Sequence, residues 1–125
     1  MTEKTQLLRQ VHPNFIQNGE VGVLAFRPNQ NDNGHLSVYD GDQITPERSH
    51  VHYTEALKLK SAGVMAVTVA ECASERLQVA SSPQADFNEH AHIDFSGCDK
   101  KQLRDRSKAL LAYAVERKWL FQVEA

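Results

Sequence analysis

The stretch "GVMAVTVAE", residues 63 to 71, decides the fold class. It is almost continuously apolar and rich in β-branched residues. Such a run is typical of a strand with both faces covered, because an alternating pattern would instead mark a strand with one wet face. We therefore expect residues 63 to 71 to form a central strand of a sheet.

A helix is predicted immediately before this strand. Thr45 is a good N-cap, Pro46 fits the first helical position because its missing N–H is not needed there, and Glu47 suits the positive end of the helix. Gly63 is a typical stop signal. The helix should therefore run from Pro46 to about Ala62.

A second helix is predicted near the C-terminus. Asp99 can cap it, and Gln102 can complete a capping box by reaching back to the backbone N–H of the cap. Its apolar side chains fall on one stripe. They are Leu103, Leu110, Leu111, Ala114 and Val115. Because each helix has a single apolar stripe, we expect both to pack on one face of the sheet.

The remaining strands are shorter and less certain in their pairing. The candidates are residues 20 to 26, 35 to 40, 76 to 80, 89 to 95 and 119 to 123. The first two should form a hairpin around the polar loop 27 to 35, and residues 4 to 10 suggest a weak amphipathic turn or helix. The sum is one α+β domain over residues 1 to 125. We expect a mixed or mainly antiparallel sheet of four or five strands, with two main helices packed on one face.

Composition places the chain among soluble cytoplasmic proteins. It has 125 residues, 41% of them hydrophobic and 24% charged, and a formal net charge of −2. That balance argues against a protein that coats nucleic acid or an anionic membrane. The two cysteines form no CxxC pair, and no segment reads as a signal peptide or a membrane span.

The charge is nevertheless unevenly placed. Residues 99 to 118 carry a net charge of +4, which leaves −6 on the rest of the chain. Lys101, Arg104 and Lys108 form one ridge of the second helix at i, i+3 and i+7. The ridge is consistent with a solvated helix face, with a contact for an acidic protein partner, or with a site that follows a phosphate backbone.

The stretch "HAHID", residues 90 to 94, contains the strongest candidate for chemistry. On a strand, His90, His92 and Asp94 project from the same face. They could hold zinc or another divalent metal if the fold supplies a third ligand, or they could transfer protons without a metal. The simpler alternative is the solvated face of an antiparallel sheet. No cofactor is required by any motif in the chain.

A second pair, His50 and His52, behaves differently. Two residues apart on a helix, these side chains diverge and cannot hold one ion. His52 falls on the inner stripe beside Tyr53. It is either a half-buried core histidine or a general base at the helix–sheet seam, and Tyr53 is a candidate contact for a substrate or partner.

Two main hypotheses for function follow. The first is a small binding or regulatory protein that acts by forming a complex with a protein partner, as an antitoxin, an immunity protein or an accessory subunit of a bacterial operon does. The second is a small hydrolase or nuclease that acts on a phosphodiester or nucleotide through His90, His92 and Asp94, assisted by His52. A third is nucleic-acid binding through the basic helix. The oligomeric state does not follow from the sequence.

Overall fold

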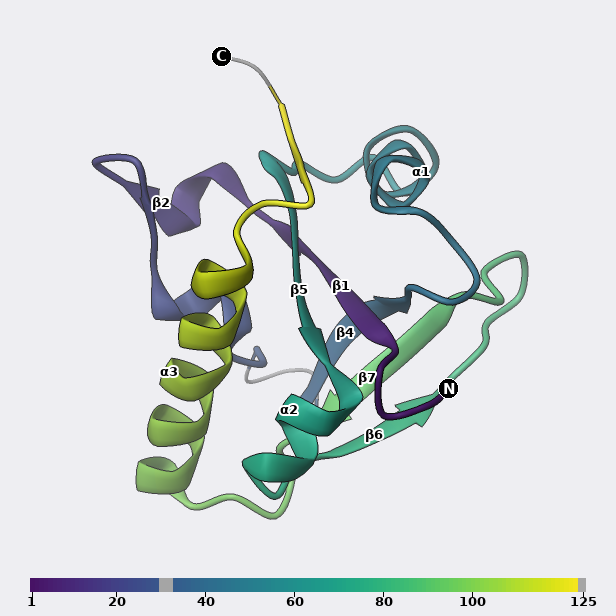
Figure 1. Ribbon diagram of the computed structural model, residues 1–125. Helices are drawn as coiled ribbons and strands as arrows, with labels where there is room; N and C mark the ends of the chain where they lie inside the picture. The colour runs from purple at the N-terminus through teal and green to yellow at the C-terminus, as the bar shows by residue number, and fades with distance from the viewer. Residues whose placement is uncertain (30–32, 124–125) are drawn as a thin grey trace.

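The computed structural model describes residues 1–29 and 33–123 and is built on a six-stranded sheet (Figure 1). All of its neighbouring strands are antiparallel. The order across the sheet is β6 (Gln78–Ser81), β7 (His90–Asp94), β4 (His35–Asp40), β1 (Gln6–Val11), β5 (Gly63–Thr68) and β8 (Phe121–Gln122). The predicted α+β class with a mainly antiparallel sheet is confirmed.

The strand β1 was not predicted, and it lies in the middle of the sheet. The weak turn or helix expected at residues 4 to 10 is wrong, because this segment pairs with β4 on one side and with β5 on the other. Leu7 and Leu8 point to opposite faces, and both are buried. A short apolar run of this kind cannot be told from a buried helix segment by its periodicity. The sheet therefore has six strands rather than four or five.

The apolar run that begins at Gly63 is divided between two elements. Its first six residues form β5, as predicted, but Thr68 then caps the short helix α2 (Val69–Ser74). The Thr68 hydroxyl accepts a hydrogen bond from the backbone N–H of Glu71, and the Glu71 carboxylate accepts one from Thr68 N–H. This capping box ends the strand three residues earlier than expected.

Residues 20 to 26 do not form the predicted hairpin with β4. Instead, β3 (Glu20–Val21) pairs with β2 (Ile16–Gln17) across a turn in which Asn18 and Gly19 both have positive φ. An Asn-Gly pair favours this kind of tight turn. The chain then forms the 3₁₀ helix η2 (Val23–Phe26), which buries Ala25 and Phe26 in the core. Another 3₁₀ turn, η1 (Pro13–Phe15), precedes β2.

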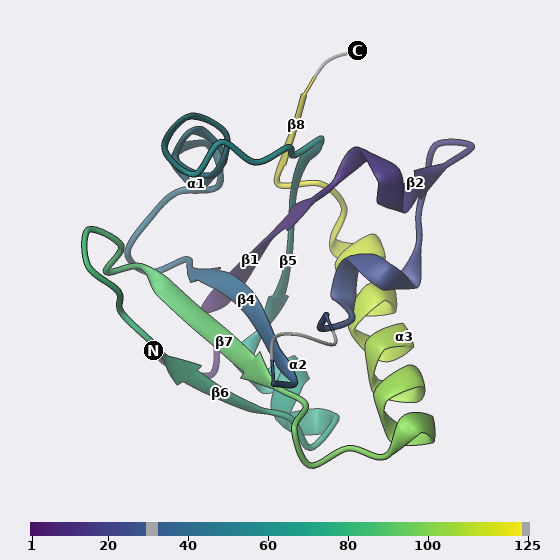
Figure 2. The same ribbon diagram turned by 180° about the vertical axis from the view of Figure 1, so that it is seen from behind.

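The helices lie on opposite faces of the sheet, which corrects the prediction that both pack on one face (Figures 1 and 2). Leu110 and Ala114 of α3 (Lys100–Arg117) pack in one cluster with Leu7 and Val67. Tyr53 packs instead against the cluster of Leu8, Tyr39, Val64, Ala66 and Phe87. Because β1 and β5 bury side chains on both sides, each side needs a cover.

The first helix is also shorter than predicted. Thr45 caps α1 (Pro46–Val51) as expected, and the chain continues into the π-helical turn η4 (His52–Ala56). It leaves the helix at Lys58, which has a φ of 58°. The Asp99 capping box of α3 and the edge strand β8 are confirmed. Within residues 1–29 and 33–123, no helix is long and apolar enough to cross a membrane.

A serine–histidine site on the open half of the sheet

The face of the sheet under α3 is called the first face, and the face that Tyr53 packs against is called the second face. The second face is only half covered. Antiparallel register places Ser37 of β4 opposite His92 of β7, with Tyr39 opposite His90 and His35 opposite Asp94. These side chains share one face, since directly opposed residues project to the same side. The predicted polar face of β7 is therefore extended by a second polar row from β4.

His90 of β7 contacts Ser37 of β4 and Ser82, which follows β6, through its two ring nitrogens. Its Nδ1 lies 3.0 Å from the Ser82 carbonyl oxygen and 2.7 Å from Ser82 Oγ, and its Nε2 lies 3.2 Å from Ser37 Oγ. A carbonyl can only accept, so the contact with the Ser82 carbonyl favours the neutral tautomer that carries the hydrogen on Nδ1. Nε2 is then the acceptor, and the Ser37 hydroxyl donates to it. The Ser37 hydroxyl, the His90 imidazole and the Ser82 carbonyl thus form a chain of hydrogen bonds like that of an activated nucleophile, its base and the group that orients the base.

Ser82 also reaches His92. Its Oγ lies 3.1 Å from His92 Nδ1, so the hydroxyl can accept from His90 and donate to His92. Burial lowers the pKa of His92, and the neighbouring His35 lowers it further. A neutral His92 that accepts at Nδ1 carries its hydrogen on Nε2.

His35 and Asp94 complete the polar face. The rings of His35 and His92 stack with centroids 4.0 Å apart and planes 12° apart. Asp94 Oδ1 lies 3.9 Å from His35 Nε2 and accepts a hydrogen bond from Ser96 N–H. Hydrogen bonding by Ser96 lowers the pKa of Asp94, and the charges of His35 and His92 add to this effect. The carboxylate is therefore ionised beside the stacked pair.

His52 is not part of this group. Its Nδ1 lies 2.7 Å from Tyr39 Oη, and its ring packs on Phe87 at a centroid distance of 4.5 Å. His90 contacts Phe87 as well, at 5.1 Å. The two predicted catalytic histidines thus share an aromatic neighbour, and the contacts of His52 with Tyr39 and Phe87 are those of a core histidine. Tyr53 is half-buried against the same core.

The predicted metal ligands do not converge. Among residues 1–29 and 33–123, no three His, Cys, Asp or Glu side chains are placed to hold a metal ion. His90 and His92 both direct Nδ1 at Ser82, while Asp94 faces His35. Within the described residues, this arrangement therefore provides no set of ligands for the predicted zinc or other divalent metal.

The predicted basic ridge lies elsewhere on the molecule. Lys101, Arg104 and Lys108 are exposed along α3, which covers the first face of the sheet. Arg104 forms a surface ion pair with Asp105 at 3.7 Å. The ridge is thus separate from the histidine face, and its role in partner binding stays a prediction.

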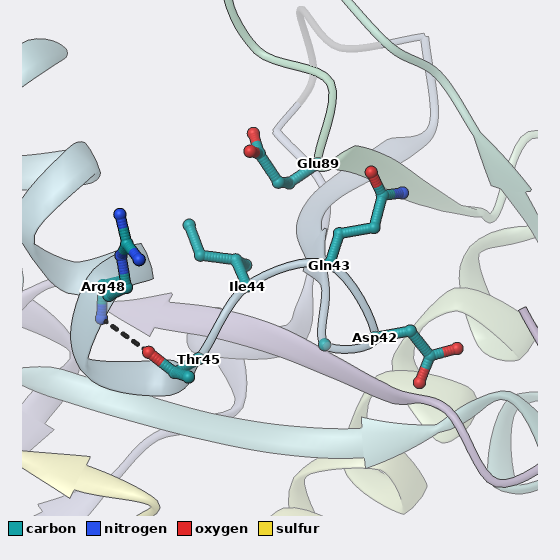
Figure 3. A pocket seen from close by; sticks show the side chains of 7 residues that line it. Asp42, Gln43, Ile44, Thr45, Arg48 and Glu89 are labelled. Atoms are coloured by element: carbon teal, nitrogen blue, oxygen red, sulfur yellow. Dashed lines mark hydrogen bonds between the residues drawn. The ribbon is translucent and has the colours of Figure 1, made fainter.

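Two shallow hollows border the site. One, of about 360 Å³, lies between the turn that follows β4 and the start of β7 (Figure 3). Arg48, Ile44 and Glu89 lie along one side of it, and Asp42 points away from them. The other, of about 370 Å³, lies where β6 and β7 approach α3. It is lined by Arg76, Gln78, Asp94, Ser96, Gly97, Cys98 and Arg106.

Sequence reasoning missed Ser37, Ser82 and His35. The alternation of residues 35 to 40 already places His35, Ser37 and Tyr39 on one face of a strand. What was missing was the pairing of β4 with β7, which no local pattern shows.

Comparisons with protein-family models, with curated proteins and with solved structures find no match for this chain.

Proposed function

We propose that this protein is a small hydrolase in which Ser37 is the nucleophile and His90 is its general base. The observation that carries the proposal is the connected set of Ser37 Oγ, His90 Nε2, His90 Nδ1 and the Ser82 carbonyl oxygen. A nucleophile within hydrogen-bond reach of a base, with the base oriented by a third group, is the recurring arrangement of nucleophilic catalysis.

The chemistry follows from these positions. Ser37 Oγ attacks the electrophilic centre of the substrate while His90 Nε2 takes the hydroxyl proton. The resulting imidazolium, held by its Nδ1–H bond to the Ser82 carbonyl, gives the proton to the leaving oxygen. Water then attacks the serine adduct and loses a proton to the same Nε2, which passes this proton to Ser37 Oγ as the adduct bond breaks. The Ser37 hydroxyl and the neutral His90 are thereby restored. His92 lies directly opposite Ser37, so its Nε2–H can stabilise the charge that develops on the substrate.

A phosphodiester or nucleotide is the proposed substrate. The half of the face that carries Ser37 is polar and open, which suits a charged, extended molecule better than an apolar one. The arginines near Asp94 are a second reason for a phosphate-bearing substrate, since guanidinium groups match phosphate geometry.

Hydrolysis of bis(p-nitrophenyl) phosphate by chelator-treated protein tests the proposal. Ser37→Ala and His90→Gln should each lower kcat/KM about 100-fold or more, because each removes a group that acts in the transition state. Ser81→Ala is the matched control, since Ser81 is exposed on the neighbouring edge strand and makes none of these contacts. Full activity in Ser37→Ala would contradict the proposal.

Complex formation with an acidic protein partner is the second candidate. It is favoured by the exposed ridge of Lys101, Arg104 and Lys108, which lies on α3 away from the histidine face. A Lys101→Glu/Arg104→Glu variant should lose a stoichiometric complex in co-purification, while Ser37→Ala keeps it. Loss of nucleic-acid binding, rather than of a protein complex, would assign the ridge to a phosphate backbone instead.

A further inference from the structure

The second hollow brings two arginines together from distant parts of the chain. Arg76 lies between α2 and β6, and Arg106 lies in the second turn of α3. Within the described part of the chain, the Arg76 guanidinium makes no hydrogen bond or ion pair. Arg106 donates from Nη1 to Cys98 Sγ at 3.2 Å, which directs its guanidinium into the hollow.

The charge of this hollow favours an anion. Arg76 and Arg106 line the hollow together with one carboxylate, that of Asp94, which already accepts a hydrogen bond from Ser96 N–H and lies near His35. One net positive charge remains in a hollow of about 370 Å³. Planar guanidinium groups bind phosphate oxygens in pairs, so two arginines that line one hollow suit a phosphate group.

We propose that the hollow between Arg76 and Arg106 binds a phosphate group of the substrate, a step that rests on the proposed function for the identity of the ligand. Asp94 lies on the rim of the hollow and is one two-residue step along β7 from His92, about 7 Å. His92 is directly opposite Ser37. The hollow therefore holds a second phosphate of a substrate whose reacting group lies at Ser37.

Arg76 allows a clean test because its backbone is left-handed, with a φ of 59°. Glycine adopts this conformation more easily than arginine does, so Arg76→Gly should fold at least as well as the native chain. Lys118 follows α3 and also has a positive φ, of 74°, and it lies outside the hollow. Lys118→Gly is therefore the matched control for the relief of strain.

The experiment is a titration of the ¹⁵N-labelled full chain with inorganic phosphate at constant ionic strength. We expect saturable shifts of the Gly97 and Cys98 amide signals and a Kd at least tenfold weaker in Arg76→Gly, with Lys118→Gly unchanged. Acetate should not compete at equal concentration. Equal phosphate affinity in the two glycine variants, absence of saturable shifts at Gly97 and Cys98, or equal competition by acetate would each overturn the inference.

The two proposals fail separately. Ser37→Ala should bind inorganic phosphate with native affinity, because Ser37 does not line the hollow. Phosphate binding without any Ser37-dependent hydrolysis would leave the hollow standing as an anion site and refute the serine mechanism. Ser37-dependent hydrolysis without phosphate binding would refute the hollow alone.

Discussion

At the scale of single residues, the site depends on which nitrogen of each histidine carries the proton. The Ser82 carbonyl favours one tautomer of His90, and burial and the charge of His35 lower the pKa of His92. Neither effect is local in sequence. The shared face of His90, His92 and Asp94 could be predicted from their alternation in the sequence. Ser37, Ser82 and His35 could not be predicted as their neighbours, because strand pairing brings them together.

The lowered pKa of His92 predicts a pH dependence of stability. Its folded pKa lies below 6.5, so the unfolded chain takes up the proton first, and the free energy of unfolding falls as pH drops below about 6.5 through the folded pKa. In urea unfolding at a series of pH values, His92→Gln should make this decline shallower. In His35→Gln, the His92 titration followed by NMR should move to higher pH. A His92 titration that does not move in His35→Gln would contradict the role of the stacked ring.

At the scale of elements, the prediction succeeded where the signal is contained in a few adjacent residues. The caps at Thr45 and Asp99 were correct because their hydrogen bonds span three residues. The element β1 was missed because two adjacent leucines do not reveal a period, and residues 20 to 26 were assigned to a strand because the Asn18–Gly19 turn signal just before them was overlooked. The covering of both faces at β5 was predicted, but the prediction that both helices pack on one face was wrong.

An ion pair between α2 and α3 should contribute to the free energy of unfolding. Glu71 of α2 receives two hydrogen bonds from the Arg117 guanidinium of α3, at 2.8 and 2.9 Å. Burial acts to raise the pKa of Glu71, but the hydrogen bonds from Arg117 and Thr68 outweigh it and lower the pKa. Glu71→Gln should therefore cost about 1–2 kcal/mol of unfolding free energy at pH 7, since this pair is partly buried and charge-assisted.

The Glu71–Arg117 pair also predicts how the free energy of unfolding changes at acid pH. The stabilisation is present above pH 4.5, the ordinary pKa of Glu71, and is lost as pH falls through its lower folded pKa. Asp105→Asn is the contrast, because it breaks the exposed pair with Arg104 and should change the unfolding free energy by less than about 0.5 kcal/mol. Equal losses in the two variants, measured by urea unfolding, would show that the Glu71–Arg117 pair has no special weight.

At the scale of the whole molecule, the division of the second face explains why the site lies where it does. The segment from α1 to η4 packs over β1, β5 and the Tyr39 end of β4, where His52 bonds Tyr39, whereas Ser37 of β4 is exposed. The basic ridge of α3 lies on the other side of the sheet. The proposed catalytic face and the proposed partner-binding ridge therefore lie apart, and substitutions can alter one without the other.

The measurement that tests the central claim most directly is covalent labelling by a fluorophosphonate, followed by mass spectrometry of the intact chain and of its peptides. The account predicts one label per chain on Ser37 and at least a tenfold slower reaction in His90→Gln, because Ser37 then loses its base. Ser81 should stay unlabelled. Labelling of Ser37 at the same rate in His90→Gln, or no labelling of Ser37 at all, would contradict the account.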